Sequence, residues 1–166
     1  MQIPESAKPF RLEDVEVGHL LVGRIRPEEK NFFAIRAEPH PAIPSEGPCL
    51  VLLNSWIADQ ALPLWFTGQR RQSVLDLGKH WFIDVPISED EPTFRSAGNT
   101  LLFKVGADFF LKLEDGNYLN LSLGTLQSEP PHLNEAFVAW AAFSIRLREP
   151  DGDDKGAEIF RWPAPT

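Results

Sequence analysis

The stretch FFLKLEDGNYLNLSL, Phe109 to Leu123, places two apolar alternations on either side of the turn-forming residues Asp115-Gly116-Asn117. Successive side chains of a strand point to opposite faces, so each alternation presents one apolar face. A three-residue loop at 115–117 keeps the two faces together, whereas a two-residue turn would mix them. The stretch therefore predicts a β-hairpin that pairs Leu113 with Leu119 and Leu111 with Leu121, with Phe109 and Leu123 on the same face.

Short apolar runs of this kind recur along the whole chain. Fifteen prolines in 166 residues separate them and exclude long helices. The runs are four to eight residues long and are bounded by turn formers, which is typical of strands. We therefore predict a mainly β fold, a single-domain antiparallel β-sandwich or a partly open β-barrel of eight to ten strands with one or two short helices. The domain spans 1–166, with 1–16 as an N-terminal extension or edge segment and 163–166 as a tail.

The region 128–142 is compatible with both a helix and a strand. Unbroken alternation from Phe137 to Leu147 favours one long strand from about Ala136, while a weaker helical stripe runs through Leu133 and Trp140. The segment after Asn54 is the best candidate for a short helix. A second hairpin is expected to align Phe143 with Trp162, Ile145 with Phe160 and Leu147 with Glu158.

Four aromatic doublets indicate that both faces of several strands are covered. Neighbouring residues on a strand point to opposite faces, so one ring of each doublet needs a second core, an edge or an interface. Two packed sheets, a barrel covered by loops, or self-association would meet this need. The doublets are Phe32-Phe33, Trp65-Phe66, Trp81-Phe82 and Phe109-Phe110.

The charge balance restricts the possible partners. Sixteen basic and twenty-four acidic residues give a formal net charge of −8, which disfavours extended electrostatic binding to nucleic acid or to anionic membranes. Cys49 is the only cysteine and reads as a buried apolar residue. The first residues lack the apolar core of a secretion signal, and no run of eighteen apolar residues occurs, so a cytoplasmic protein is the expectation.

The acidic loop REPDGDDKGAE, Arg148 to Glu158, has the appearance of a calcium site. Counted from Asp151, however, the fifth ligand position of an EF-hand is Lys155 and the twelfth is Trp162, and neither can bind calcium. We predict a solvated connection between two strands and no specific calcium site. Histidine and cysteine also lack metal-binding spacing, and no nucleophile motif is present. The sequence predicts no cofactor, no metal and no catalytic residue, so an enzyme is not the favoured class.

The segment from Trp65 to Trp81 combines aromatic and basic residues within an acidic protein. This combination suits an anion, a sugar or a nucleotide. The alternative is that the tryptophans belong to the core and that the arginines form an exposed hairpin tip. The candidate ligand-binding residues are Trp65, Arg70, Arg71, His80 and Trp81.

The segment VEVGHLLVGRI, Val15 to Ile25, resembles the opening strand of small nucleic-acid-binding β-barrels. The resemblance covers eleven residues and implies weak nucleic-acid binding, with Phe32 and Phe33 available to stack on bases. The net charge makes nucleic acid an unfavourable partner.

Three functional hypotheses follow. The first is a non-enzymatic binding or protein-interaction module, such as an acidic protein that masks a basic partner, or a homo-oligomer formed through exposed aromatic side chains. The second is a small-ligand or enzymatic site in the mouth of a β-barrel, and the third is a weak nucleic-acid-binding barrel. A flat exposed apolar patch would favour the first, and a concave pocket lined by converging polar residues would favour the second.

Overall fold

The computed structural model describes residues 8–24, 31–39, 47–53, 63–85, 101–129, 137–140, 142–148 and 156–162. Within these ranges the chain forms fourteen β-strands and one 3-10 helix. The strands make three antiparallel sheets, and none of the sheets closes into a barrel. The prediction of a mainly β, antiparallel fold is confirmed, although the strands outnumber the eight to ten expected.

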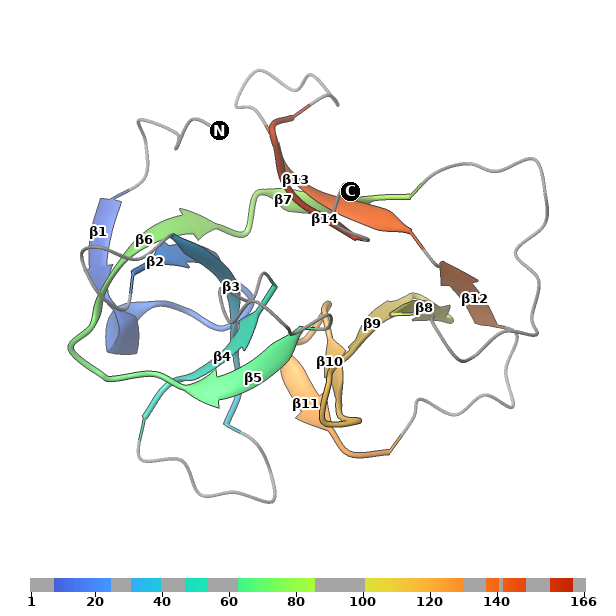
Figure 1. Ribbon diagram of the computed structural model, residues 1–166, viewed down its shortest axis with the longest axis horizontal. Helices are drawn as coiled ribbons and strands as arrows, with labels where there is room; N and C mark the ends of the chain where they lie inside the picture. The colour runs from blue at the N-terminus through green and yellow to red at the C-terminus, as the bar shows by residue number, and fades with distance from the viewer. Residues whose placement is uncertain are drawn as a thin grey trace.

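The six-stranded sheet lies at the left of Figure 1. Its strand order is β1-β6-β2-β3-β4-β5, so β1 and β5 are its edge strands. The helix η1 (Leu12–Asp14) follows β1 directly, so residues 8–14 form an edge strand of this sheet and the helix next to it. The strands are β1 (Lys8–Arg11), β2 (Leu20–Gly23), β3 (Phe32–Ala37), β4 (Cys49–Leu52), β5 (Leu64–Thr67) and β6 (Ser73–Gly78).

This sheet is curled around its own small core. Side chains from strands that are distant in the sheet, such as Val74 on β6 and Phe66 on β5, pack in the same cluster. The ring of Phe32 meets that of Phe66 edge-on, with centroids 6.3 Å apart. The fully buried Leu12 of η1 belongs to the same cluster, so its side chain packs inside the curl.

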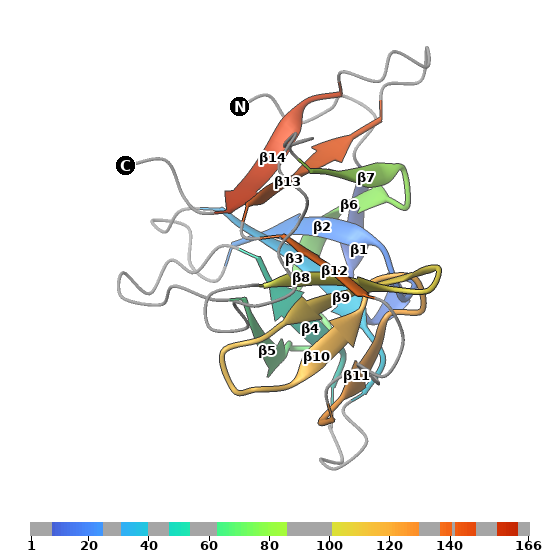
Figure 2. The same cartoon turned by 90° about the vertical axis from the view of Figure 1, so that its right-hand side faces the viewer.

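Two smaller sheets cover the outer face of the curl, and Figure 2 shows the three-stranded sheet above the other two. The five-stranded sheet has the order β11-β10-β9-β8-β12, and the three-stranded sheet the order β14-β13-β7. The former contains β8 (Leu102–Val105), β9 (Asp108–Lys112), β10 (Tyr118–Asn120), β11 (Thr125–Gln127) and β12 (Phe137–Trp140). The latter contains β7 (Trp81–Asp84), β13 (Phe143–Leu147) and β14 (Glu158–Trp162).

Both faces of the curled sheet are therefore buried, as the aromatic doublets predict. In β3, Phe32 packs inside the curl and Phe33 packs in the main core between the sheets. In β5 the assignment is Trp65 to the main core and Phe66 to the inside. Because Phe32 and Phe33 are almost fully buried, neither ring is available to stack on a base.

The β9–β10 hairpin has the predicted loop length and apolar face but a different register. Leu119 lies opposite Leu111, and the Leu113 N–H donates to the Asn117 carbonyl oxygen at 2.8 Å. The three-residue loop is therefore 114–116, with Gly116 at a φ of +85° as its last residue. The predicted pairing of Leu113 with Leu119 is wrong by two residues, and a shift of two leaves every side chain on its predicted face.

Leu123 does not belong to that face. Strand β10 ends at Asn120, whose side-chain oxygen accepts the backbone N–H groups of Ser122 and Leu123 at 2.9 and 3.0 Å. This turn directs Leu123 outward, where its exposed fraction is 63%. A side chain that accepts hydrogen bonds from the backbone two and three residues further on competes with continuation of the strand. The apolar alternation therefore predicted the wrong position for Leu123.

The predicted strand from about Ala136 to Leu147 is two strands. β12 pairs with β8 and β13 pairs with β7 and β14, so the two segments belong to different sheets. The expected alignments of Phe143 with Trp162 and of Ile145 with Phe160 are confirmed. A bulge after Ile145 then sets Glu158 opposite Arg146, where the sequence predicted Leu147.

Gly156 allows the chain that leads into β14 to pass close to the end of β13. A Cβ atom at Gly156 would lie 1.4 Å from the carbonyl oxygen of Leu147, so only glycine permits this approach. The remainder of the acidic loop, 149–155, and the helix candidate after Asn54 lie outside the described residues.

Candidate functional site

The five sequence-predicted site residues lie in three places. Arg70 and Arg71 precede β6, whereas His80 and Trp81 follow it, and Trp65 is on the opposite edge strand β5. β6 is six residues long, so its two ends are roughly 20 Å apart. The structure therefore does not bring the five residues to one pocket.

The two tryptophans serve as anchors of the main core. Trp81 donates its indole N–H to the Gly18 carbonyl oxygen at 3.1 Å, and the Trp65 indole N–H donates to the Asp115 carboxylate. Both rings pack against the main core. Their polar atoms and apolar faces are engaged within the fold, as the core alternative predicts.

The two arginines are exposed and line different hollows. Arg71 lines one of about 320 Å³ with Gln69 and Gln72, while Arg70 lines one of about 240 Å³ with Glu13 and Arg36. His80 is exposed on the connection to β7, and its carbonyl oxygen accepts the Arg148 N–H at 2.7 Å.

Arg36 is the most enclosed of these cations. Its Nη1 donates to the Cys49 carbonyl oxygen at 2.9 Å and to that of Ala37, and its Nε has no partner among the described residues. Burial lowers the pKa of the guanidinium below its usual value, an effect that Cys49 and Glu38 oppose. Arg36 thus links the backbones of β3 and β4 at the hollow that it lines together with Arg70.

A different set of residues converges at the start of β6. Arg11 on β1 pairs with Ser73, and continuing the β2 register one step beyond Gly23 and Val74 brings Arg24 opposite Ser73 from the other side. Cross-strand partners project from the same face of a sheet. Arg11, Ser73 and Arg24 therefore form a polar row across three strands.

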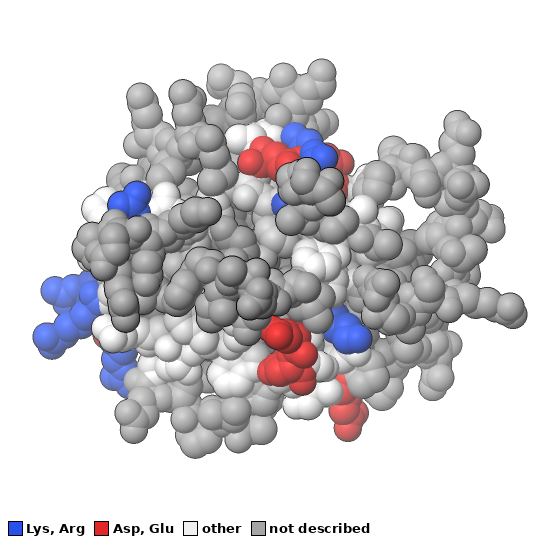
Figure 3. All heavy atoms as spheres, viewed as in Figure 1, with Lys and Arg blue, Asp and Glu red and all other residues white. Residues whose placement is uncertain are grey.

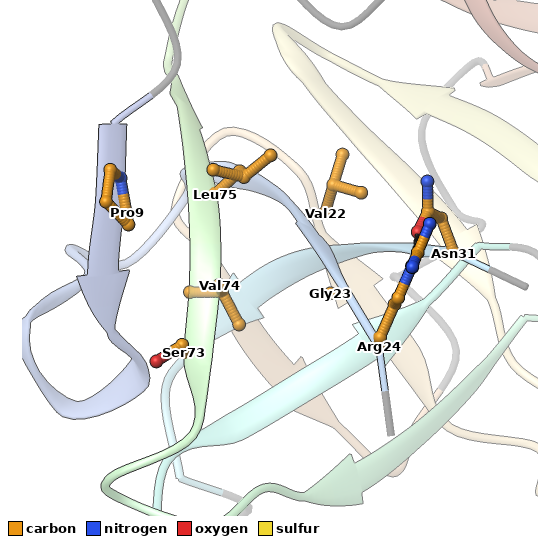
Figure 4. A pocket seen from close by; sticks show the side chains of 8 residues that line it. All are labelled: Pro9, Val22, Gly23, Arg24, Asn31, Ser73, Val74 and Leu75. Atoms are coloured by element: carbon orange, nitrogen blue, oxygen red, sulfur yellow. Dashed lines mark hydrogen bonds between the residues drawn. The ribbon is translucent and has the colours of Figure 1, made fainter. Parts of the chain in front are cut away.

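An apolar row lies directly beside the polar row. Pro9 and Val22 both pair with Leu75, two residues along β6 from Ser73, so these side chains share the face of the polar row. Between them lies a hollow of about 290 Å³, shown in Figure 4 and called here the three-strand hollow. Its lining residues are Pro9, Val22, Gly23, Arg24, Asn31, Ser73, Val74 and Leu75.

Arg24 is held at the wall of the three-strand hollow. Its Nε donates to the Asn31 side-chain oxygen at 2.5 Å, and its carbonyl oxygen accepts from the Gln72 amide at 3.2 Å. Figure 4 shows the Arg24 and Asn31 side chains next to each other, rising to the same side as Val22. No partner of the terminal guanidinium nitrogens occurs in the part of the chain that the structure describes. Those nitrogens can donate to an incoming anion.

Exposed arginines gather at this end of the molecule although the whole chain is acidic. Arg11, Arg24, Arg70 and Arg71 are all exposed here. In Figure 3 basic atoms project from the left edge, where Figure 1 has the connection between β5 and β6. A local cluster of this kind attracts anions despite the net charge of −8.

Sequence reasoning identified only part of this cluster. It selected Arg70 and Arg71 because they are adjacent to each other and to aromatic residues. Arg11 and Arg24 lie roughly fifty to sixty positions before Ser73 and carry no local motif; only the strand order β1-β6-β2 unites them.

A second polar cluster joins the far end of β6 to the turn before β2. His19 Nδ1 donates to the Asp76 carboxylate at 2.9 and 3.0 Å, since a carboxylate can only accept. Asp76 also accepts the Gly78 N–H at 2.8 Å. Both side chains are largely buried, at 17% and 12% exposed, so this cluster fastens the turn.

Across the described ranges, no three His, Cys, Asp or Glu side chains are grouped as a metal ion would need. The same ranges contain no helix with the length and apolarity to cross a bilayer. Comparison with models of protein families, with curated protein sequences and with solved structures finds no match. The fold and the site therefore define the protein only by its architecture: it is a mainly β protein of three antiparallel sheets with an arginine-lined hollow at one end.

Proposed function

We propose that the protein is a non-enzymatic binding module that takes a small anionic ligand with an apolar body in the three-strand hollow. The observation that carries this proposal is the pair of adjacent rows on β1, β6 and β2. One row supplies apolar contact and the next supplies two guanidinium groups around a hydroxyl. Such a combination of apolar walls with a few converging polar groups is typical of small-ligand sites.

The ligand class follows from the lining. A hollow of about 290 Å³ is at the small end of ligand sites, which suits a compact molecule. Pro9, Val22 and Leu75 favour an aliphatic or aromatic body, and the fork of Arg24 favours a carboxylate, which it can bind with two parallel hydrogen bonds. Arg11 lies one strand away from Ser73 and adds charge without blocking the apolar floor.

Binding is favoured over catalysis by the residue types present. The eight described residues that line the hollow include no Asp, Glu, His or Cys. None of these described residues is therefore a base that could activate Ser73 as a nucleophile.

The apolar surface supports the same choice between the hypotheses. Among the described residues, Phe10 on β1 and Leu123 in the turn after β10 are the exposed large hydrophobic side chains, and β1 and β10 belong to different sheets. The described residues thus supply a concave site more readily than a flat apolar patch.

Titration of the isotope-labelled protein with octanoate, followed by amide chemical shifts, tests the proposal. We expect shifts centred on Val22 and Leu75, and affinity reduced roughly ten- to hundredfold in Arg24→Gln, because a hydrogen bond to a charged group contributes about 1.5–3 kcal/mol. Lys79→Gln removes the same charge at the other end of β6 and is the matched control, with little change expected. Equal binding of octanol, or unchanged affinity in Arg24→Gln, would reject the proposal.

A further inference from the structure

The hollow lined by Arg71 adjoins the three-strand hollow and shares Arg24 with it, but its lining is mainly polar. It lies between the end of β5 and the start of β6 and has a volume of about 320 Å³. None of the described residues that line it is acidic. They are Arg24, Phe66, Thr67, Gly68, Gln69, Arg71 and Gln72. We call it the Arg71 hollow.

The chain that forms this hollow is fastened at both ends. The Gly68 N–H donates to the Pro48 carbonyl oxygen at 2.9 Å, and the Gln72 N–H donates to that of Gln69 at 3.0 Å, which closes a tight turn. The Gln72 carbonyl oxygen in turn accepts the Leu12 N–H at 2.9 Å. The turn is therefore positioned before any ligand arrives, which reduces the entropy lost on binding.

Gly68 allows this turn to approach the 3-10 helix. A Cβ atom at Gly68 would lie 2.3 Å from Cδ2 of Leu12, a side chain that is itself fully buried. The close approach packs the β5–β6 connection against Leu12 of η1. The ring of Phe66, which packs in the same cluster as Leu12, also lines the hollow.

The two neighbouring arginines have different surroundings. Arg70 lines the smaller hollow together with Glu13, whose negative charge repels an anion there. Arg71 shares its hollow with two carboxamide side chains and Arg24. The potential for an anion is therefore more favourable on the Arg71 side of the connection.

We propose that the Arg71 hollow is a binding site for a phosphoryl group. Arg71 offers a planar fork of N–H donors, and Gln69 and Gln72 add amide donors from the two ends of the turn. Gln72 already donates one hydrogen to the Arg24 carbonyl oxygen, so the second remains for a ligand. Several donors around one hollow suit a group with three acceptor oxygens better than a carboxylate with two. The site is independent of the proposed carboxylate ligand, although Arg24 lines both hollows.

The decisive experiment compares the two adjacent arginines. Labelled wild type, Arg71→Gln and Arg70→Gln are titrated with inorganic phosphate at ionic strength held constant with chloride. We expect saturable amide shifts at Gly68, Gln69 and Gln72, an affinity at least about fivefold weaker in Arg71→Gln, and a change of less than about twofold in Arg70→Gln. Both arginines are exposed, so circular dichroism is expected to show that each variant folds.

A second arm distinguishes the sources of the phosphoryl group. Tighter binding of a short phosphoserine peptide than of inorganic phosphate assigns the site to a phosphorylated segment, and equal binding assigns it to free phosphate. Equal weakening in the two variants, or shifts that chloride reproduces, would overturn the proposal. Octanoate binding is measured on the same samples, and Arg71→Gln is expected to leave it unchanged, so failure at one hollow is separable from failure at the other.

Discussion

Gly23 lies directly opposite Phe32 in the β2–β3 ladder, and the ring of Phe32 occupies the space that a side chain at Gly23 would need. A Cβ atom at Gly23 would come within 2.4 Å of the ring carbon Cζ. Phe32 is fully buried inside the curl, so the ring has no free direction in which to move. The curl of the six-stranded sheet and the shape of the three-strand hollow, which Gly23 also lines, therefore depend on the same pair.

Gly23→Ala is expected to destabilise the protein by about 1–3 kcal/mol, the usual cost of inserting a methyl group into a packed core. Urea unfolding measures this loss. In a Phe32→Leu background the same substitution is expected to cost less, because the leucine leaves room for the methyl group. Additive losses of stability in the double variant would show that the Phe32 ring does not restrict the size of the side chain at residue 23.

The Asp76 carboxylate is expected to contribute more to stability than the carboxylate of Asp84. Asp76 accepts from His19 and from the Gly78 backbone in a largely buried position. Asp76→Ala leaves those donors unpaired, which costs about 1–3 kcal/mol. Asp84 is 48% exposed and pairs with Arg146, which keeps a second partner in Glu158, so Asp84→Ala is expected to cost less than about 1 kcal/mol. Equal losses in urea unfolding would contradict this ranking.

The sequence was sufficient to assign faces but not register in the β9–β10 hairpin. Alternation determines which side chains share a face, and Leu111 and Leu119 are both in the main core. Register is decided by the turn, where Gly116 takes the left-handed conformation and the Asp115 carboxylate accepts the Asn117 N–H at 3.1 Å. Gly116 and Asn117 could each adopt the left-handed conformation, so the residue types alone are compatible with a loop at 114–116 and with one at 115–117.

The site was less accessible to sequence reasoning than the hairpin. Arg24 and Ser73 are brought together by the order β1-β6-β2, in which a late strand inserts between two early ones. Local patterns contain no information on such a pairing. The break between β12 and β13 was hidden for a similar reason, because alternation continues through it while the partner sheet changes.

Leu121 and Leu123 test the corrected end of that hairpin. Both belong to the same alternation, yet Leu121 is buried in the main core and Leu123 is exposed. Leu121→Ala is expected to cost about 2–5 kcal/mol, as for other buried leucines. Leu123→Ala is expected to change stability by less than about 0.5 kcal/mol. Thermal and urea unfolding of the two variants compare them directly, and similar losses would place Leu123 in the core after all.

The β13–β14 hairpin is expected to lose stability in acid through Glu158. Arg161 donates to both oxygens of this carboxylate, at 2.9 and 2.7 Å, and Arg146 approaches one of them at 3.4 Å. The hydrogen bond from Arg161 is the main cause that lowers the pKa of Glu158 below its usual value of 4.5; slight burial opposes it, and the charges of both arginines assist it. A carboxylate whose pKa is lower in the folded state binds its proton more readily after unfolding.

The stabilisation by Glu158 is therefore complete above the usual glutamate pKa and is lost as the pH falls through the lowered value. We expect wild type to be more stable than Glu158→Gln at about pH 7, and the difference to shrink below about pH 4.5 and to vanish in stronger acid. Urea unfolding of both proteins across this range measures the difference. Arg161→Gln removes the main cause of the shift and is expected to flatten the same pH dependence. A difference between wild type and Glu158→Gln that stays constant with pH would show that the ion pair does not stabilise the hairpin.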